Sequence, residues 1–325
     1  MHYSQTIALR LTKQSSTVDL KNTFKNELES LSFIKKINVY EIFSLQKSLF
    51  DKNSLEIYDN MEEVSDPYWL EYWPENEYEI TKPVRIKSNV ISAEGQIDLY
   101  FLRGYEQTVK LIELHSKQAS EIDAINIQYL IDIYKNQLEL FNKFERDHLT
   151  GLYNRLTFDE KVMQLIQSNY VDESRMVEED SHNWLAILDI DHFKKINDHY
   201  GHMYGDEILL LFADIMKNTF RFNDLLFRYG GEEFVVCLFR VKQEGAISAM
   251  ERFRKAIENY IFPSGRRVTV SIGLAKVLDN ELPTNLLDRA DTSLYKAKDT
   301  GRNKLCISEI KESTNSESDE MVELF

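Results

Sequence analysis

A stretch of the chain without Gly or Pro constrains the possible fold more than any other sequence feature. It follows Gly104, and we expect residues 106–146 to form one long helical stretch. Apolar residues recur in it at steps of three and four, at Ala124, Ile127, Ile131, Tyr134, Leu138 and Phe141. Such a stripe is typical of a helix that packs along another surface. Because 325 residues exceed one typical domain, the helix is expected to join two of them.

The sequence leaves open which surface the stripe packs on. One interpretation is a coiled-coil seam, in which residues 119–146 form a signalling helix that pairs with a second copy of the chain. The other is a helix that packs on the N-terminal domain of its own chain.

The first domain, residues 1–118, has the pattern of a mixed α/β module. Leu20, Phe24, Leu28 and Leu31 follow helical spacing. Four short runs are rich in β-branched and aromatic residues and predict strands: Ile37–Phe43, Leu55–Tyr58, Tyr78–Ile86 and Gln96–Leu102. A helix, several strands and a long final helix resemble the sensory domains of the GAF and PAS kind. The aromatic cluster Trp69, Tyr72 and Trp73 fits either a ligand pocket or an ordinary core.

The second domain, residues 147–310, alternates predicted strands and helices and predicts an α/β fold, with a central mixed sheet and helices packed on it. The strands are expected at Trp184–Asp189, Leu225–Tyr229, Phe234–Phe239, Val268–Lys276 and Lys304–Ser308, and the helices at Met203–Met216, Ile247–Ile261 and Leu286–Lys298. Residues 311–325 are rich in Ser and Glu and are expected to form a disordered acidic tail.

The net charge narrows the choice of partners. A formal charge of −15 argues against a nucleic-acid partner, because such proteins gain affinity by neutralising phosphates with Lys and Arg. A phosphate-bearing ligand would need a local metal ion, a few basic side chains or backbone amides. No apolar run is long enough to span a bilayer, and the N-terminus does not have the pattern of a signal peptide, so we expect a cytoplasmic protein. Cys237 and Cys306 are expected to be buried thiols.

Two acidic motifs lie beside predicted strands. Asp189 ends an apolar run and Asp191 follows it, which places carboxylates where Mg²⁺ finds hard oxygen ligands. Gly230-Gly231-Glu232-Glu233 joins two strands, and the glycines permit a positive φ there. Either motif alone also fits a strand-end cap or a solvated surface hairpin.

Several motifs in a fixed order resemble the GGDEF family of diguanylate cyclases over about residues 146–308. They are Asp147-His-Leu-Thr-Gly-Leu-Tyr-Asn-Arg155, Asp189-x-Asp-x-Phe-Lys-x-x-Asn197-Asp198, Gly201-His202, Gly205-Asp206, Arg228-Tyr-Gly-Gly-Glu-Glu-Phe234 and Tyr295-x-Ala-Lys298-x-x-Gly-Arg302-Asn303. The central run is Gly-Gly-Glu-Glu-Phe, with Glu where the family name has Asp.

The resemblance implies a role for each matching residue. Asp189, Glu232 and the carbonyl of Ile190 would bind two Mg²⁺ ions, or Mn²⁺ in their place, and Glu233 would belong to the catalytic site. The triphosphate of GTP would meet the amides of His192 and Phe193 and the side chains of Lys194, Lys298 and Arg302. Asn197 and Asp206 would hydrogen-bond guanine.

The resemblance also implies a reaction and its regulation. The ribose 3′-hydroxyl of one GTP would attack the α-phosphorus of another, and two such steps would give cyclic di-GMP and two pyrophosphates. Because each domain holds one GTP, the enzyme would work as a homodimer. Arg221 and Asp224, with Arg252, resemble an inhibitory site that binds cyclic di-GMP. The alternative function is a catalytically silent domain that senses GTP or cyclic di-GMP.

Overall fold

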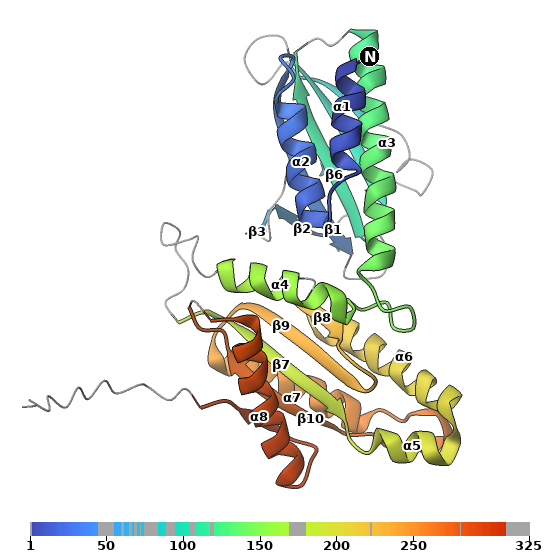
Figure 1. Cartoon of the computed structure of the whole chain (residues 1–325), viewed down its shortest axis with the longest axis vertical. Helices are drawn as coiled ribbons and strands as arrows, with labels where there is room; N and C mark the ends of the chain where they lie inside the picture. Colours follow the sequence, from blue (N-terminus) through green and yellow to red (C-terminus); the bar gives the residue numbers. More distant parts are fainter. Residues whose placement is uncertain are drawn as a thin grey trace, which may run out of the picture. The chain divides into compact units, whose positions relative to one another are not determined.

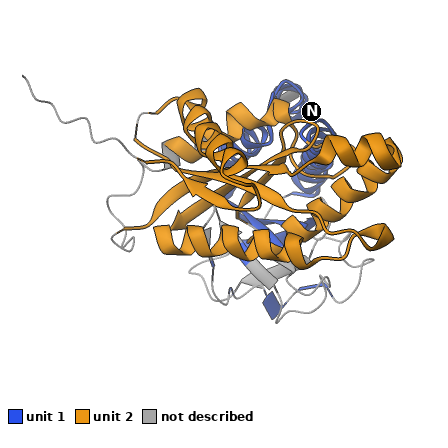
Figure 2. Cartoon of the chain, turned by 90° about the horizontal axis from the view of Figure 1, so that it is seen from below, with its two compact units in different colours: residues 1–145 blue, residues 146–325 orange. Residues whose placement is uncertain are grey.

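The chain folds into two compact units, residues 1–145 and 146–325 (Figure 2). The computed structural model describes residues 2–44, 55–59, 62–64, 67, 70–71, 73–74, 84–88, 95–103, 108–117, 120–168, 180–221, 223–279 and 281–309. Residues 311–325, for which a disordered tail is predicted, and the side chains of Trp69 and Tyr72 lie outside the described residues.

The first unit is a six-stranded antiparallel sheet with three helices on one face (Figure 1). The strand order is β3-β2-β1-β6-β5-β4. The strands are β1 (Ile34–Ser44), β2 (Leu55–Asp59), β3 (Glu62–Glu63), β4 (Val84–Ser88), β5 (Gly95–Arg103) and β6 (Thr108–Ser116), and the helices are α1 (His2–Leu11), α2 (Thr17–Glu29) and α3 (Glu121–Phe144). A second apolar cluster, which includes Trp73 and Phe101, covers the other face of the sheet. The α+β class is as predicted, and the likeness to GAF and PAS domains stays a prediction.

The helix predicted over residues 106–146 is wrong in its first part. Residues 108–116 form β6, a central strand that pairs with β1 and β5. Four successive residues of β6 are buried because both faces of the sheet are covered: Leu111, Ile112, Glu113 and Leu114. A strand buried on both faces shows no alternation of apolar and polar residues, so its sequence cannot be told from that of a buried helix.

The helix α3 begins at a capping box, in which Ser120 and Asp123 each bond the backbone of the other. Four residues of its predicted apolar stripe, Ile127, Ile131, Tyr134 and Leu138, are buried within the first unit, and Ala124 and Phe141 are half-buried. Tyr134 stacks on Phe24 with ring centroids 4.2 Å apart. The predicted stripe of α3 therefore packs on the N-terminal domain of its own chain, which is the second of the two interpretations. The opposite side of α3 carries a second set of apolar side chains that are exposed: Ile122, Ile125, Tyr129, Leu140 and Phe144.

The second unit is a five-stranded mixed sheet between two layers of helices, which confirms the predicted fold class (Figure 1). The order is β11-β10-β7-β9-β8, with β10 and β11 parallel and the other pairs antiparallel. The strands are β7 (His182–Ile190), β8 (Leu225–Arg228), β9 (Glu233–Val241), β10 (Val270–Lys276) and β11 (Leu305–Ile307).

The helices of this unit cover both faces of its sheet. One face packs on α5 (Phe193–Tyr200), α6 (His202–Thr219) and α7 (Gln243–Asn259), and the other on α4 (Arg155–Ser168) and α8 (Pro283–Asp299). Cys237 is buried as predicted, whereas Cys306 is only half-buried. Within the described residues, no helix is both long and apolar enough to cross a membrane.

Candidate active site

The two predicted acidic motifs meet at one end of the sheet of the second unit. Asp189 lies opposite Glu233 in the antiparallel register of β7 and β9. The Ile190 amide donates a hydrogen bond of 3.3 Å to the carbonyl of Glu232. The turn between β8 and β9 is closed by the Tyr229 amide, which donates to the Glu233 carbonyl at 2.8 Å. Carboxylates from two separate segments are thus brought to the same edge.

The carboxylate of Asp189 attracts a cation. Its Oδ2 is 2.7 Å from Nζ of Lys298, which comes from α8. Burial raises the pKa of Asp189, the contact with Lys298 opposes that shift, and the charges of Glu232 and Glu233 raise the pKa further. A group of acids with a single ammonium beside it favours additional positive charge. The residues present therefore fit a divalent cation.

The side chains alone do not complete a metal site. Across the described part of the chain, no three His, Cys, Asp or Glu side chains are grouped so that they could hold a metal ion. Asp189 and Glu232 would need further oxygen ligands, such as the Ile190 carbonyl and a bound triphosphate. Mg²⁺ commonly binds in this way, through one or two carboxylates and substrate phosphates.

The predicted phosphate-binding residues follow β7 directly. His192 has a left-handed backbone, with φ of 59°, and precedes the first residue of α5. This bend starts a helix of eight residues immediately after the strand. The first amides of a helix have no partner within it, and here the first intrahelical bond is the one from the Lys195 amide to the His192 carbonyl, at 2.9 Å. The predicted amides of His192 and Phe193 come before that bond and are suited to an anion. The Lys194 side chain is exposed.

The predicted guanine-binding residues lie on two neighbouring helices. Asn197 is on α5, and Gly205 and Asp206 are in the first turns of α6. A Cβ atom on Gly205 would lie 1.9 Å from Oδ1 of Asn197, so any other residue there would displace the Asn197 amide from this position. Oδ1 of Asn197 is buried and accepts no hydrogen bond from the described residues. Asp206 directly follows Gly205 in the sequence and is exposed.

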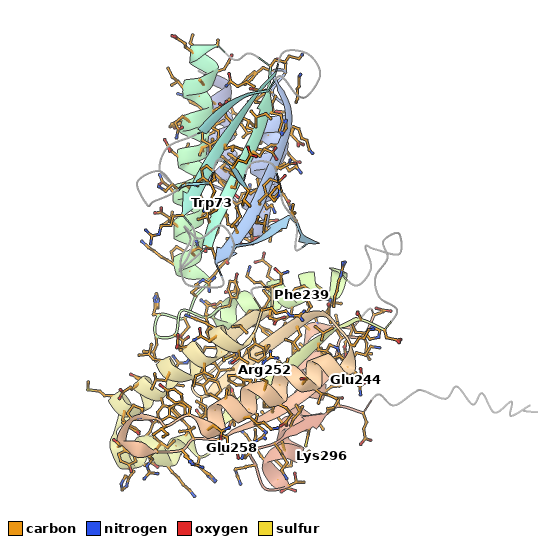
Figure 3. The ribbon with its side chains drawn as sticks, turned by 180° about the vertical axis from the view of Figure 1, so that it is seen from behind. Trp73, Phe239, Glu244, Arg252, Glu258 and Lys296 are labelled. Carbon is orange, nitrogen blue, oxygen red and sulfur yellow. The ribbon has the colours of Figure 1, made fainter. Side chains whose placement is uncertain are left out.

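The predicted inhibitory residues also lie together. Asp224 is buried, and its Oδ2 accepts a hydrogen bond of 2.8 Å from the Arg221 amide. Burial raises the pKa of Asp224 to about 6, although the backbone of Arg221 and the charges of Arg221 and Arg252 act in the opposite direction. Arg252 lies on α7 and donates to the Thr219 carbonyl at 2.9 Å (Figure 3).

Two expectations about the acidic motifs need correction. Neither Gly230 nor Gly231 has a positive φ. A Cβ on Gly230 would lie 2.9 Å from Oε2 of Glu233, whereas one on Gly231 would meet open space. Asp191 is not available as an oxygen ligand, because its buried carboxylate already accepts from Thr269, Ser271 and Asn303.

A link between the start of the second unit and the acidic turn was not predicted from the sequence. Asp147 accepts hydrogen bonds from the Thr150 amide at 2.8 Å and from Nη1 of Arg228 at 3.1 Å. Nε and Nη2 of Arg228 donate to the carbonyl of Gly231 at 3.2 and 3.1 Å. Asp147 and Arg228 both belong to motifs that resemble the family, but they are 81 residues apart, and the sequence gives no sign that they are in contact.

The second unit is thus a mixed α/β domain with acids, a lysine and a helix N-terminus at one edge of its sheet. The family model described as "Diguanylate cyclase, GGDEF domain" matches residues 144–304. The diguanylate cyclase SiaD of Pseudomonas aeruginosa, solved with its activator SiaC, is 30% identical with a TM-score of 0.51, over 57% of this chain and 70% of that chain. The chain belongs to the GGDEF family of diguanylate cyclases.

Curated relatives extend beyond the matched region. The uncharacterized protein YhcK of Bacillus subtilis (strain 168) is 39% identical over 57% of this chain and 52% of that protein. The probable diguanylate cyclase DgcT of Escherichia coli (strain K12) is 33% identical over 66% of this chain and 46% of that protein. The chain therefore spans about half the length of these two relatives.

Proposed function

We propose that this protein condenses two GTP into cyclic di-GMP and two pyrophosphates. The observation that carries the proposal is the meeting of Asp189 and the Glu232–Glu233 turn at one sheet edge, with Lys298 on Asp189. Family membership supports the same reaction. GTP is a cytoplasmic nucleotide, so we place the reaction in the cytoplasm.

Asp189, Glu232 and the Ile190 carbonyl would hold two Mg²⁺ ions, or Mn²⁺ in their place. Bound there, the ions would lower the pKa of the attacking 3′-hydroxyl and neutralise charge on the leaving pyrophosphate. The amides of His192 and Phe193 and the side chains of Lys194, Lys298 and Arg302 would bind and orient the β- and γ-phosphates. Asn197 and Asp206 would select guanine, and Glu233 would act beside Glu232. Positioning and fixed charges then supply the rate without a side-chain nucleophile.

Each second unit would hold one GTP, so two copies of the chain are needed for one product. The enzyme is therefore proposed to be a homodimer. Arg221, Asp224 and Arg252 would bind cyclic di-GMP and inhibit the enzyme when product accumulates. The first unit is proposed to be the sensory part, which would act on the enzyme through α3.

The test is product formation by the full chain. With GTP and Mg²⁺, chromatography should detect cyclic di-GMP, and Asp189→Ala or Glu232→Ala should lower its rate by at least about 100-fold because fixed charges at the reacting phosphates dominate catalysis. The control is Glu244→Ala, which removes an exposed acid at the start of α7 (Figure 3). A folded, dimeric protein that binds GTP without consuming it would instead be a sensor of the nucleotide.

A further inference from the structure

The loop after α8 contains three consecutive residues with a left-handed backbone. The φ angles are 114° at Gly301, 62° at Arg302 and 46° at Asn303. Gly adopts this region freely and Asn tolerates it, but a long side chain such as that of Arg302 is strained in it. Such a run of residues persists only where the surroundings fix it. The contacts that hold this loop therefore also set the position of Arg302, which the loop carries.

Asn303 is held on every side by hydrogen bonds. Its amide N–H donates to Oδ2 of Asp191 at 3.1 Å. Its side-chain Nδ2 donates to Oε1 of Glu258 at 2.7 Å, and its Oδ1 accepts from Nη1 of Arg254 at 2.8 Å. The preceding amide, that of Arg302, donates to the Ala297 carbonyl at 3.0 Å.

Asp191 ties the loop to the centre of the sheet. It is buried and also accepts hydrogen bonds of 2.7 Å from the hydroxyls of Thr269 and Ser271. Its own amide donates to the Thr269 carbonyl at 2.9 Å. Three donors to one buried carboxylate satisfy its charge and fix its position. The anchor lies two residues beyond Asp189, so the same end of β7 supports both the acidic site and the loop.

The helix α7 supplies the other anchor. Arg254 pairs with Glu258 and Glu251 at 3.0 Å each, so its guanidinium is fixed where it meets Asn303. Glu258 lies near the end of α7 and Glu244 near its start (Figure 3). Arg254 and Glu258, the two side-chain partners of Asn303, therefore also pair with each other, and the three side chains form a closed hydrogen-bonded triangle.

Arg302 is exposed, and none of the described residues hydrogen-bonds its guanidinium. Its backbone is fixed by the hydrogen bond of its own amide to Ala297 and by that of the Asn303 amide to Asp191, while its side chain is available to a ligand. We propose that Asn303 is a positioning residue, which through Asp191, Arg254 and Glu258 holds Arg302 ready to bind the terminal phosphates of the nucleoside triphosphate. The inference rests on the proposed function for the identity of the ligand.

The test compares the affinity of the full chain for GTP and for GMP, which lacks the terminal phosphates. Asn303→Gly removes the side-chain hydrogen bonds to Arg254 and Glu258, and Gly adopts the left-handed backbone without strain. Asn303→Ala removes the same hydrogen bonds but keeps a Cβ in the left-handed backbone. Both should weaken GTP binding by about tenfold through lost preorganisation and leave GMP binding unchanged. Glu244→Gln is the matched control, because it removes an exposed carboxylate at the other end of α7, and it should leave the ratio of the two affinities as in the wild type.

A double-mutant cycle separates positioning from a general structural effect. In the background of Arg302→Ala, Asn303→Gly should have no further effect on GTP binding, because the guanidinium that it positions is gone. Equal loss of GTP and GMP affinity, an unchanged ratio, or additive effects of the two substitutions would each overturn the inference. So would a wild type that binds GTP no better than GMP. A wild type that prefers GTP but makes no cyclic di-GMP would overturn only the proposed function.

Discussion

Asp189 lies near the end of β7 and Asp191 directly follows that strand, but their carboxylates are used differently. Asp191 accepts three hydrogen bonds and is satisfied by its own chain. Asp189 has Lys298 as a partner and two further acids nearby, which leaves a net negative site. A buried carboxylate that is fully hydrogen-bonded supports structure, whereas a buried carboxylate beside other acids favours a cation. The pair of residues thus joins a structural anchor to a binding site.

Gly205 is expected to be essential for the position of Asn197. In Gly205→Ala, the new Cβ would clash with Oδ1 of Asn197 and approach Cζ of Phe193 to 3.2 Å. Because Oδ1 is the end of a side chain that can rotate away, the free energy of unfolding should fall by only about 1 kcal/mol, the lower end of the cost of overpacking. Because Asn197 is the proposed guanine ligand, the KM for GTP should also rise by about tenfold, the size of one lost hydrogen bond to a buried partner. Steady-state kinetics and urea unfolding measure the two effects.

The second substitution Asn197→Ala is the control for this clash. In the Gly205→Ala background it removes the side chain that the Cβ meets, so most of the lost stability should return. The KM for GTP should stay high, because the guanine ligand is then absent. A Gly205→Ala protein with the KM of the wild type would contradict the role given to Asn197.

At the scale of elements, the segment that opens the second unit is fastened to the acidic turn. Asp147 binds Arg228, and Arg228 binds the Gly231 carbonyl. The ring of Tyr229 is also in contact with this part of the chain, since Phe158 meets it edge-on at 5.0 Å and the Arg155 guanidinium lies 4.8 Å above it. The turn that holds Glu232 is therefore positioned by residues that begin immediately after the first unit.

Asp147→Asn should weaken this link in a manner that depends on pH. Burial tends to raise the pKa of Asp147, but hydrogen bonds from Thr150 and then the charge of Arg228 outweigh it and lower the pKa below 3.8. A lowered pKa in the folded state contributes stability above the unfolded value, which is lost as the pH falls through the folded value. Because Asp147 is partly exposed, we expect a loss of only about 1 kcal/mol in the free energy of unfolding at pH 7.

Urea unfolding at a series of pH values checks this prediction. The difference between wild type and Asp147→Asn should be constant from pH 7 to about pH 5 and should shrink below pH 4. Asp159→Asn, which removes an exposed carboxylate on α4, controls for the change in net charge. A difference that grows as the pH falls would show that the ion pair with Arg228 is not its source.

The elements differ in how far the sequence could predict them. From Trp184 onward the sequence predicts every strand and the helices α6, α7 and α8, because motifs and apolar runs mark them. It does not predict α5, a helix of only eight residues that is too short to show a helical repeat. The strand β6 was not predictable either, because burial on both faces removes the alternation that identifies a strand. The carboxylate of Asp191 and the Asp147–Arg228 pair were likewise missed, since their partners depend on contacts across more than 75 residues.

At the scale of the whole molecule, the two units have separate cores. The helix α3 belongs to the first unit by its packing, although it leads directly into the second. Its exposed apolar side chains include Ile122 at 70%, Ile125 at 69% and Phe144 at 73% exposure. They recur along a helix of 24 residues, which spans about 36 Å. Apolar residues at this spacing on one exposed side are typical of a helix that pairs with another helix.

We expect a second copy of the chain to cover this side of α3, because the proposed reaction needs two copies for each product. The double substitution Ile125→Glu and Tyr129→Glu places charge in the middle of the exposed side. It should weaken dimerisation by well over tenfold, since burial of each such side chain is worth about 1.5–3 kcal/mol. Analytical ultracentrifugation measures the dimer, and the specific activity of the variant should fall on dilution at concentrations where the wild type is unaffected. Leu156→Glu, at a residue 91% exposed on α4, is the control and should leave the dimer intact. A double variant that remains a dimer and keeps its activity would place the interface elsewhere on the molecule.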